Sequence, residues 1–366
     1  AINLGGETIH KFFRFPPRMF DTREVGVRRK NPVVGQLKLI IIDEISMVRA
    51  DLIDNINEVL IKWTGVNEPF GGIQILVVGD LFQLPPVLAP GSEETIFKSR
   101  YKSMWFFNAN IFRDLEIIGI NLTDNFRQQD KRFIQVLDDC RMGRSVDDTC
   151  DWLNGRCLKD PFEIPETLTL TATNKAADLY NLRRFEALRT TEVVYEGRVE
   201  GDFDIAERRF PAPKILRLKV GAQVMITRNL PEAMNGSLCR VINLDEREIE
   251  VEKLDDGNIF GVKKVKWKQV EYSLNPSEFS IEAIASGHFK QFPLALGWAI
   301  TIHKSQGLTL SSILLDLGSG AFASGQAYVG LSRCRNVNNI ALARPMQPKD
   351  IIVDEEVLRF TSKLFA

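Results

Sequence analysis

The sequence predicts an α/β protein with two parallel-sheet cores and a small all-β insertion in the second core. Three observations lead to this fold class. Aliphatic runs alternate with amphipathic helical patterns up to residue 192 and again after residue 285, as in parallel sheets covered by helices. Residues 193–285 instead contain short strand-like runs separated by Gly, Asn and Asp turns. The length of 366 residues exceeds the ~250–300 residues at which a single core stops growing.

Residues 37–42 are expected to form the first buried strand, because an Ile-rich run without polar alternation suits a parallel sheet covered on both faces. A helix follows over residues 51–63, where apolar residues recur with the spacing of one helix face. A second buried strand is expected over residues 73–78, and Pro85 and Pro86 end regular structure after it. Strand, helix and strand therefore follow one another as in α/β structure.

The same patterns extend through the rest of the chain. Further core elements are expected at residues 117–122 (strand), 133–140 (helix), 167–171 (strand), 292–300 (strand), 313–317 (strand) and 325–333 (helix). Strands of the insertion are expected at residues 218–227, 237–244, 248–254 and 262–271. The predicted domains are a first core at residues 1–128, a second core at residues 129–192 and 286–366, and the insertion at residues 193–285.

The composition limits the classes of function. A net charge of −1 gives no bulk attraction for nucleic acid, so any such affinity must come from local basic patches. The five cysteines show no C-x-x-C spacing and the three histidines no paired ligand spacing, which argues against disulfides and transition metals. Free cysteines fit a reducing, intracellular compartment. No apolar run approaches the ~18–20 residues of a membrane span, so no membrane partner is expected.

Acidic residues stand at the end of the first strand. A strand that ends in Asp43-Glu44 is the arrangement with which NTPases hold Mg²⁺ through the Asp while the Glu orients and deprotonates water. Acidic residues also cap helices that follow strands, so this pair alone leaves both interpretations open. Asp80 and Gln83 follow the second strand, where a neutral amide can sense a γ-phosphate. Both strand ends are expected side by side at the ligand-binding edge of the sheet.

Two arginines complete a candidate phosphoryl-transfer site. Arg127 follows a strand and precedes a helix, and Arg333 lies on the last predicted helix of the second core. Either can be an ordinary surface arginine. Placed across a cleft from Asp43, both would reach a transferred phosphoryl group, where a guanidinium is worth ~10³–10⁵ in rate.

Three polar loops suggest contacts with a nucleic-acid backbone. Residues 301–307 read Thr-Ile-His-Lys-Ser-Gln-Gly and bring hydroxyl, imidazole, ammonium and amide groups together after an apolar strand. Such groups can grip a phosphodiester backbone without reading bases, although many loops are polar for solvation alone. The candidates in the three loops are Thr8, His10, Thr173, Asn174, Thr301, His303, Lys304, Ser305 and Gln306. We expect these loops to line one channel.

Four long stretches in a fixed order resemble the motif set of the Pif family of DNA helicases, in the 5′-to-3′ branch of superfamily one. They are residues 41–47, 78–86, 301–307 and 328–333. Residues 5–13 are similar to the end of the family's first DNA-contacting motif, and the similarity then runs essentially to the C-terminus. Chance agreement of four such motifs in order is remote.

The resemblance implies two RecA-like domains, an SH3-like insertion in the second, ATP and Mg²⁺ in the cleft, and single-stranded DNA across the top. It also implies a monomer on DNA that moves towards the 3′ end, with forked duplex DNA as a further partner. Residues 14–34 occupy the place of the family's strand-separating wedge, with a solvated loop as the alternative. The expected compartment is intracellular, namely the bacterial cytoplasm, or the nucleus or mitochondrion of a eukaryote.

The resemblance also assigns roles residue by residue. Asp43 would bind Mg²⁺, Glu44 would be the catalytic carboxylate, and Gln83 would contact the γ-phosphate. Arg127 and Arg333 would be arginine fingers. The remaining assignments are nucleotide contacts at Asp80 and Gly307 and DNA contacts at Phe82 and Pro85, beside the polar loop residues named above.

The sequence departs from the family in its phosphate-binding loop. ATP hydrolysis by this fold needs a glycine-rich loop followed by Lys and then Ser or Thr. None of the 25 glycines is followed by lysine, and in the family that loop precedes the motif with which this sequence starts. We therefore expect a complete helicase as the parent protein and no hydrolysis by residues 1–366 alone. Two alternatives stay open: an ATP-dead fragment that binds single-stranded DNA, and a RecD-like recombination helicase.

Overall fold

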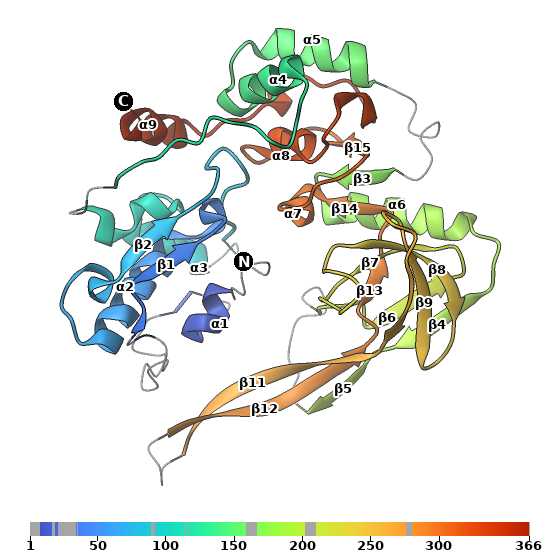
Figure 1. The fold of residues 1–366 in the computed structure, drawn as a ribbon, viewed down its shortest axis with the longest axis horizontal. Coiled ribbons are helices and arrows are strands. Elements are labelled where there is room, and N and C mark those ends of the chain that lie inside the picture. The colour runs from blue at the N-terminus through green and yellow to red at the C-terminus, as the bar shows by residue number, and fades with distance from the viewer. Residues whose placement is uncertain are drawn as a thin grey trace.

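The computed structural model describes residues 8–16, 19–20, 34, 36–88, 92–113, 115, 117–158, 167–201, 210–275 and 280–365. These residues form a first core, a second core and a β insertion, each with its own hydrophobic cluster (Figure 1). Both cores contain parallel strands and the insertion is all-β, which confirms the predicted fold class. Of the predicted wedge at residues 14–34, only residues 14–16, 19–20 and 34 are described. None of the described helices is both long and apolar enough to cross a bilayer.

The first core is built around α2 (Ala50–Thr64), the helix predicted from its apolar periodicity. Its buried face presents Ile53, Ile56 and Leu60 to the cluster of this core, and Gly65 ends the helix in the left-handed conformation. The other elements of the core are α1 (Ile9–Phe13), β1 (Leu39–Ile42), η3 (Ile45–Met47), η4 (Pro69–Gly72), β2 (Gln74–Val77), α3 (Ser92–Arg100), η5 (Phe106–Asn108) and η6 (Asn110–Arg113), where η marks a 3-10 helix.

Strands β1 and β2 pair in parallel, with Leu39 opposite Gln74 and Ile42 opposite Val77. One face of this pair packs on the core through Ile42, which is buried, whereas Ile41 on the other face is 56% exposed. The expectation of a sheet covered on both faces therefore does not hold for the described residues, because none of them covers the second face.

The second core contains a four-stranded parallel sheet in the order β14-β3-β15-β16. Every residue of β3 and β16 is buried, as expected for a sheet covered on both faces. Its elements are α4 (Lys131–Met142), α5 (Val146–Cys157), β3 (Leu168–Thr171), α6 (Asn174–Ala187), β14 (Ala299–Thr301), α7 (Ile302–Ser305), β15 (Ile313–Asp316), α8 (Gln326–Ser332), η9 (Val337–Asn339), β16 (Ile340–Leu342) and η10 (Pro348–Asp350).

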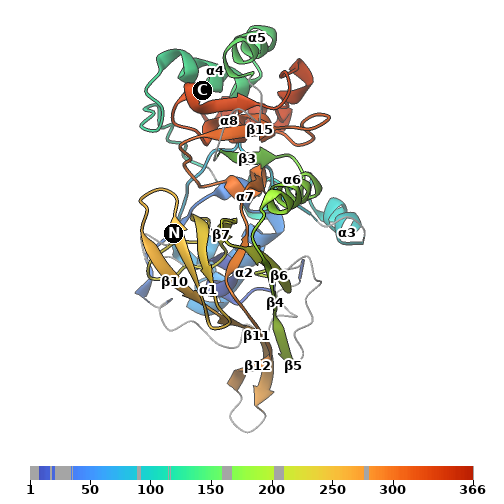
Figure 2. The ribbon, with the colours of Figure 1, turned by 90° about the vertical axis from the view of Figure 1, so that its right-hand side faces the viewer.

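The β insertion lies between α6 and β14 in the chain. Its core is enclosed by a five-stranded sheet, in the order β10-β9-β8-β7-β13, and by the pair β4-β6. Strands β11, β12 and β5 form a third sheet that projects from the insertion as an arm (Figures 1 and 2). The strands are β4 (Glu192–Glu196), β5 (Arg198–Gly201), β6 (Ile215–Lys219), β7 (Gln223–Ile226), β8 (Leu238–Leu244), β9 (Glu248–Lys253), β10 (Ile259–Lys263), β11 (Val265–Asn275), β12 (Ser280–Gln291) and β13 (Leu294–Leu296).

Residues 117–122 are predicted as a strand, but the structure gives them no regular conformation. Ile118 and Leu122 are 87% and 85% exposed. A strand satisfies its backbone groups only through a neighbouring strand, and no described strand pairs with this segment. The aliphatic pattern alone was therefore insufficient here.

Two other predicted strands are divided by glycines. Residues 292–300 fall into β13 of the insertion and β14 of the second core, so the sheet of the insertion extends past residue 285. At the division, a Cβ atom on Gly297 would lie 2.8 Å from the backbone nitrogen of Met225 in β7. Residues 218–227 fall into β6 and β7, divided at Gly221, which has a φ of 88°. Both glycines mark places where the chain turns or passes too closely for a side chain.

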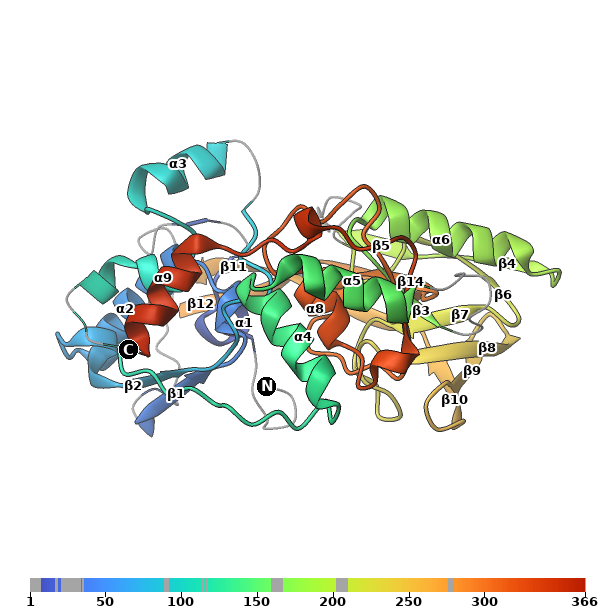
Figure 3. The ribbon, with the colours of Figure 1, turned by 90° about the horizontal axis from the view of Figure 1, so that it is seen from above.

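Helix α9 (Glu355–Leu364) follows the second core in the chain but packs on the first core, next to η5 and η6 (Figures 1 and 3). The ring of Phe360 stacks on Phe107 with a centroid separation of 4.0 Å. Val357 is fully buried in a cluster that contains residues of both cores. The last described helix therefore ties the two cores together.

Candidate functional site

The ends of β1 and β2 lie side by side. The backbone N–H of Ile45 donates to the carbonyl of Val78 at 3.0 Å, which joins the loop after β1 to the loop after β2. A Cβ atom on Gly79 would lie 2.9 Å from the Ile45 nitrogen, so this approach requires glycine. The acidic pair at the end of β1 is thereby held beside the loop that carries Asp80 and Gln83.

Glu44 has a left-handed backbone conformation, with φ 53° and ψ 47°, which is uncommon for a residue with a side chain. Such a conformation costs roughly 1–2 kcal/mol and persists only where surrounding contacts impose it. Here the N–H of Glu44 donates to Asp43 Oδ1 at 2.9 Å, and the N–H of Met47 donates to the Glu44 carbonyl at 3.0 Å. Observed strain at an acidic strand end favours a functional position over a simple cap.

Gln306 contacts two of the candidate nucleotide residues of the first core, Glu44 and Gln83. It follows α7 of the second core, and its Nε2 donates to Glu44 Oε2 and to Gln83 Oε1, each at 3.3 Å. Its Oε1 is buried and has no hydrogen-bond partner among the residues that the structure describes. The sequence assigned Gln306 to the DNA-contacting loop, whereas in the structure its amide lies against the acidic strand end.

A cavity of about 590 Å³ lies between the loop after β2, the segment before α4, and α8. It gathers four of the predicted site residues, which the sequence had placed on three separate segments. Its charged and amide lining includes Asp80, Gln83, Arg127, Gln128, Arg141 and Arg333. Arg127 Nη1 and Gln128 Nε2 both donate to the carbonyl of Ser332 at 3.1 Å, which fixes the segment before α4 to the end of α8.

Arg333 is only 2% exposed and is held entirely by neutral oxygens. Its Nε donates to the Val329 carbonyl at 3.1 Å, and Nη2 donates to Ser332 Oγ at 2.9 Å. Burial, together with the nearby charge of Arg127, lowers the pKa of Arg333 to about 10. Within the part of the chain that the structure describes, no carboxylate forms an ion pair with Arg333. Two crowded guanidinium groups of this kind fit an anion such as a phosphate.

The fit of a divalent metal rests on Asp43. Its side chain stands at the exposed end of β1, where a carboxylate oxygen suits a hard cation. No cluster of three or more His, Cys, Asp or Glu side chains positioned to hold a metal occurs among the residues described. Mg²⁺ often uses only one or two carboxylates together with phosphate oxygens, so this arrangement suits Mg²⁺ better than a metal that needs a full protein cage.

A groove of about 600 Å³ runs between α6 and the β insertion. It brings together Asn174, Thr301 and Lys304, three of the predicted DNA contacts, although two of them are more than 120 residues from the first in sequence. Arg217 and Phe210 of the insertion also line it. Sequence analysis did not single out these two residues, because only the folded insertion brings them to α6. Cation, amide, hydroxyl and ring together suit a single-stranded backbone and its bases.

The other residues of the polar loops lie near this groove but differ in what their side chains do. Thr173 Oγ1 caps α6 by accepting from Ala176 N at 3.2 Å. Ser305 is fully buried, and its hydroxyl donates to the Ile302 carbonyl at 2.7 Å. His303 is partly buried, and burial lowers its pKa.

Five further predicted site residues, like Asp43, Glu44 and Gln306 above, line neither cavity. Thr8 and His10 belong to the start of α1 in the first core, and the pKa of His10 is lowered by desolvation and by Arg49. Gly307 has a φ of 80° and open space around it. Phe82 and Pro85 lie in the loop after β2, where Phe82 is 7% exposed and packs in the cluster with Val357. The DNA contacts at Thr8, His10, Phe82 and Pro85 and the nucleotide contact at Gly307 therefore stay predictions.

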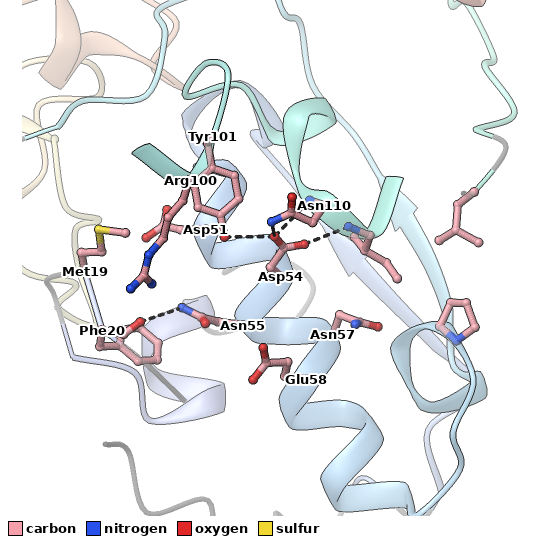
Figure 4. A pocket seen from close by; sticks show the side chains of 13 residues that line it. Met19, Phe20, Asp51, Asp54, Asn55, Asn57, Glu58, Arg100, Tyr101 and Asn110 are labelled. Carbon is pink, nitrogen blue, oxygen red and sulfur yellow. Dashed lines mark hydrogen bonds between the residues drawn. The ribbon is translucent and has the colours of Figure 1, made fainter. Parts of the chain in front are cut away.

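Another cavity, of about 780 Å³, opens beside α2 in the first core (Figure 4). Its central carboxylate, Asp54, is already saturated by structural hydrogen bonds. It accepts from the Tyr101 hydroxyl at 3.0 Å, from Asn110 Nδ2 at 2.8 Å, and from the backbone N–H groups of Asn110 and Ile111 at 3.0 Å each (Figure 4). This cavity therefore belongs to the scaffold of the first core.

Comparison with known proteins gives two matching family models. The model described as PIF1-like helicase matches residues 1–150, and the model described as DNA helicase Pif1, 2B domain, matches residues 206–244. The second match falls inside the β insertion.

Curated relatives match the chain from end to end. ATP-dependent DNA helicase Pif1 of Bdellovibrio bacteriovorus is 31% identical over 371 residues, which cover 98% of this chain and 79% of that protein. ATP-dependent DNA helicase PIF1 of Xenopus laevis is 32% identical over 383 residues, which cover 98% of this chain and 55% of that protein. The chain thus spans about half the length of the vertebrate relatives.

Solved structures share the fold of nearly the whole chain. Bacteroides Pif1 bound to single-stranded DNA has a TM-score of 0.80 and 33% identity, and the match covers 99% of this chain and 84% of that chain. Bacteroides Pif1 in complex with ADP-AlF3 and single-stranded DNA has a TM-score of 0.80 and 32% identity, with the same coverage. Pif1 helicase from Candida albicans has a TM-score of 0.81 and 29% identity, covering 99% and 86%. These similarities confirm the predicted RecA-like architecture.

Proposed function

Since this chain belongs to the family of PIF1-like helicases, we propose that it is the motor of an ATP-dependent helicase that moves 5′ to 3′ on single-stranded DNA and unwinds duplexes. The observation that carries the proposal is Arg333, a buried guanidinium without an ion-pair partner in the described part of the chain, which lines the same cavity as Gln83 and Arg127. A buried cation in this setting is stabilised by binding an anion, and the γ-phosphate of ATP is the anion that the proposed reaction requires.

The proposed roles in hydrolysis are those that membership of the family implies, and the positions of the side chains support them. Glu44 orients and deprotonates the attacking water, and Gln83 contacts the γ-phosphate through its neutral amide. Arg127 and Arg333 stabilise the charge that develops on the transferred group. Asp43 holds Mg²⁺, which would supply charge neutralisation on the phosphate oxygens. Asp80 and Gly307 stay proposed nucleotide contacts at the edge of the site.

We propose that single-stranded DNA follows the groove between α6 and the β insertion, with Asn174, Thr301 and Lys304 as its contacts. Forked duplex DNA is the proposed substrate for unwinding, and the chain is proposed to act as a monomer wherever cellular DNA is found: the bacterial cytoplasm, or the nucleus or mitochondrion of a eukaryote. Gln306 joins the DNA loop to Glu44 and Gln83, which supports coupling between DNA occupancy and hydrolysis.

The test is steady-state ATP hydrolysis, with and without single-stranded DNA, by a protein that carries this chain together with a phosphate-binding loop, since no glycine of the 366 residues is followed by the lysine that such a loop needs. The proposal expects DNA-stimulated turnover that falls by at least ~10²-fold in Glu44→Gln, since the variant loses the carboxylate that activates water. Glu58→Gln, on the exposed side of α2 and outside the lining of the cavity that contains Arg333, is the matched control and should keep its turnover. Tight binding of single-stranded DNA without any turnover would instead restrict residues 1–366 to the DNA-binding role.

A further inference from the structure

Asp80 is the centre of a polar cluster that bridges the two cores. The Tyr328 hydroxyl on α8 donates to Asp80 Oδ2 at 2.8 Å, and Arg141 Nε on α4 donates to Asp80 Oδ1 at 3.2 Å. The Phe82 N–H donates to the same Oδ1 at 3.1 Å and fixes the carboxylate within its own loop. Both oxygens of Asp80 therefore contact the second core. We call Asp80, Arg141 and Tyr328 the clasp.

The clasp lies directly over the apolar join between the cores. The guanidinium of Arg141 stands 4.6 Å from the ring centroid of Phe82. Phe82 is buried in a cluster with Trp105 of the first core and Val357 of α9. The cation above the ring and the apolar packing below it hold the loop after β2 between the two cores.

The backbone of this loop also touches the second core without any intervening side chain. A Cβ atom on Gly325, at the start of α8, would lie 2.1 Å from the Phe82 carbonyl oxygen and 2.8 Å from that of Gln83. Gly325 has a φ of 69°, so both the conformation and the closeness require glycine. The loop is therefore seated on α8 by backbone contact as well as by the clasp.

This arrangement fixes the relation between two proposed catalytic residues. Gln83 belongs to the loop of Asp80, and its N–H donates to the Asp80 carbonyl at 3.1 Å. Arg333 directly follows α8, the helix that carries Tyr328. Its Nε donates a hydrogen bond to the carbonyl of Val329, the residue after Tyr328. The hydrogen bond between Asp80 and Tyr328 therefore fixes the position of Gln83 relative to Arg333. On the opposite part of the site, the contacts of Gln306 with the first core are longer, at 3.3 Å each.

We propose that Arg141 and Tyr328 are positioning residues: by holding Asp80 they place Gln83 against Arg333 and form a fixed joint between the two cores on this side of the cleft. The effect of Arg141 and Tyr328 on catalysis rests on the proposed function. The joint that they form between the cores does not depend on it. Burial and the charge of Asp80 raise the pKa of Tyr328, which keeps its hydroxyl protonated as a donor. Burial is the largest single influence on the pKa of Arg141 and lowers it, but Asp80, Tyr328 and Asp138 together outweigh burial and raise this pKa.

The joint is tested by hydrogen exchange of the whole chain, read by mass spectrometry for residues 80–84 and 325–329. We expect exchange of both segments to become at least ~10-fold faster in Arg141→Met and in Tyr328→Phe, because local opening no longer has to break the clasp. Arg156→Met on α5, whose guanidinium stands 5.5 Å from the ring centroid of Trp152 on the same helix, is the first control. Tyr180→Phe, which loses a hydroxyl bond to Asp316 within the second core, is the other. Both controls should leave residues 80–84 unchanged.

The positioning role is tested by kinetics in a protein that hydrolyses ATP. Arg141→Met should lower kcat by ~10-fold with little change in KM for ATP, and Arg141→Lys should recover part of kcat because the cation is retained. Unchanged exchange in residues 80–84 overturns the joint, and unchanged kcat beside faster exchange overturns the positioning role. If the proposed ATPase activity itself is wrong, the protein without any substitution shows no turnover. The exchange experiment does not depend on turnover and still decides whether the joint exists.

Discussion

Arg333 is buried, charged and bonded only to neutral oxygens, so its charge lacks a partner of opposite sign within the described structure. Phosphate is expected to fill that role. We expect inorganic phosphate to raise the unfolding midpoint of the chain, because a ligand that binds only the folded state stabilises it by mass action. The rise should largely vanish in Arg333→Met, measured by thermal unfolding over a phosphate titration. Arg240→Met, a partly exposed arginine of the β insertion, is the control, and an equal loss there would contradict the assignment.

Burial of His303 is expected to make the stability of the folded protein depend on pH. Burial lowers its pKa from 6.5, so the folded state binds a proton less readily than the unfolded chain. Stability is therefore lost as pH falls through 6.5 towards the lower pKa of the folded state. We expect His303→Asn to flatten the fall in urea midpoint between about pH 7 and pH 5. His10, whose pKa is also lowered, acts in the same direction, and the double variant should show the flattest profile. If the urea midpoint of the double variant instead fell more steeply with decreasing pH, the two histidines would not destabilise the folded state on protonation.

Lys304 is an exposed cation of the groove between α6 and the β insertion. If it contacts one phosphate of single-stranded DNA, its removal eliminates one released counterion. We expect Lys304→Ala to reduce the slope of log K against log salt by ~0.7, measured by fluorescence anisotropy of a labelled oligonucleotide. Lys363→Ala on α9 should leave the slope unchanged. A slope that is equal in both variants would place the DNA elsewhere.

At the scale of single elements, two neighbouring helices differ in how they begin. The carboxylate of Asp130 caps α4 by accepting from the N–H groups of Arg132 and Phe133 at 2.8 and 3.1 Å. Ser145 stands at the same position of α5 but makes no side-chain capping bond. We expect Asp130→Ala to lower the free energy of unfolding by about 1 kcal/mol and Ser145→Ala to change it by only a few tenths of that. Urea unfolding of both variants tests this, and equal losses would argue against the cap.

Elements with strong local signals were predictable, as α2 and α4 illustrate. Their apolar periodicity reports a buried face that exists whatever the remainder of the chain does. Residues 117–122 carry an equally aliphatic run, but a strand depends on a neighbour that its own sequence cannot specify. Gly297 could not be recognised as a boundary between two sheets, because the reason for it is the closeness of β7, not the local sequence.

The candidate site was predictable to the extent that its residues lie at strand ends and in motifs. The structure gathers Gln83, Arg127 and Arg333 in one cavity, although their roles stay predictions. The clasp left no signal in the sequence, because its partners are far apart in the chain. Asp80 is separated from Arg141 by 61 positions and from Tyr328 by 248 positions. Arg141 on its helix looked like any polar residue opposite an apolar face.

For the whole molecule, α9 is expected to contribute to the join between the cores. Val357 is fully buried in the cluster shared by both cores. We expect Val357→Ala to lower the free energy of unfolding by about 2 kcal/mol, the lost apolar contact plus a small cavity. It should also separate the calorimetric transition into two, one for each core. Phe365→Ala, at a residue that is 46% exposed, should retain the original transition. A single unshifted transition in Val357→Ala would show that α9 contributes little.

The position of α9 also sets an order of events during synthesis. Trp105 donates to Asp354, the residue that caps α9, across 249 positions of sequence. At ~5–20 residues per second, translation takes roughly 12–50 s to cover that distance. During this time the aromatic residues beside η5 have no helix to cover them, although the rest of the first core has already left the ribosome. The newly made first core is therefore expected to be a client of chaperones that recognise exposed aromatic surface until the last helix arrives.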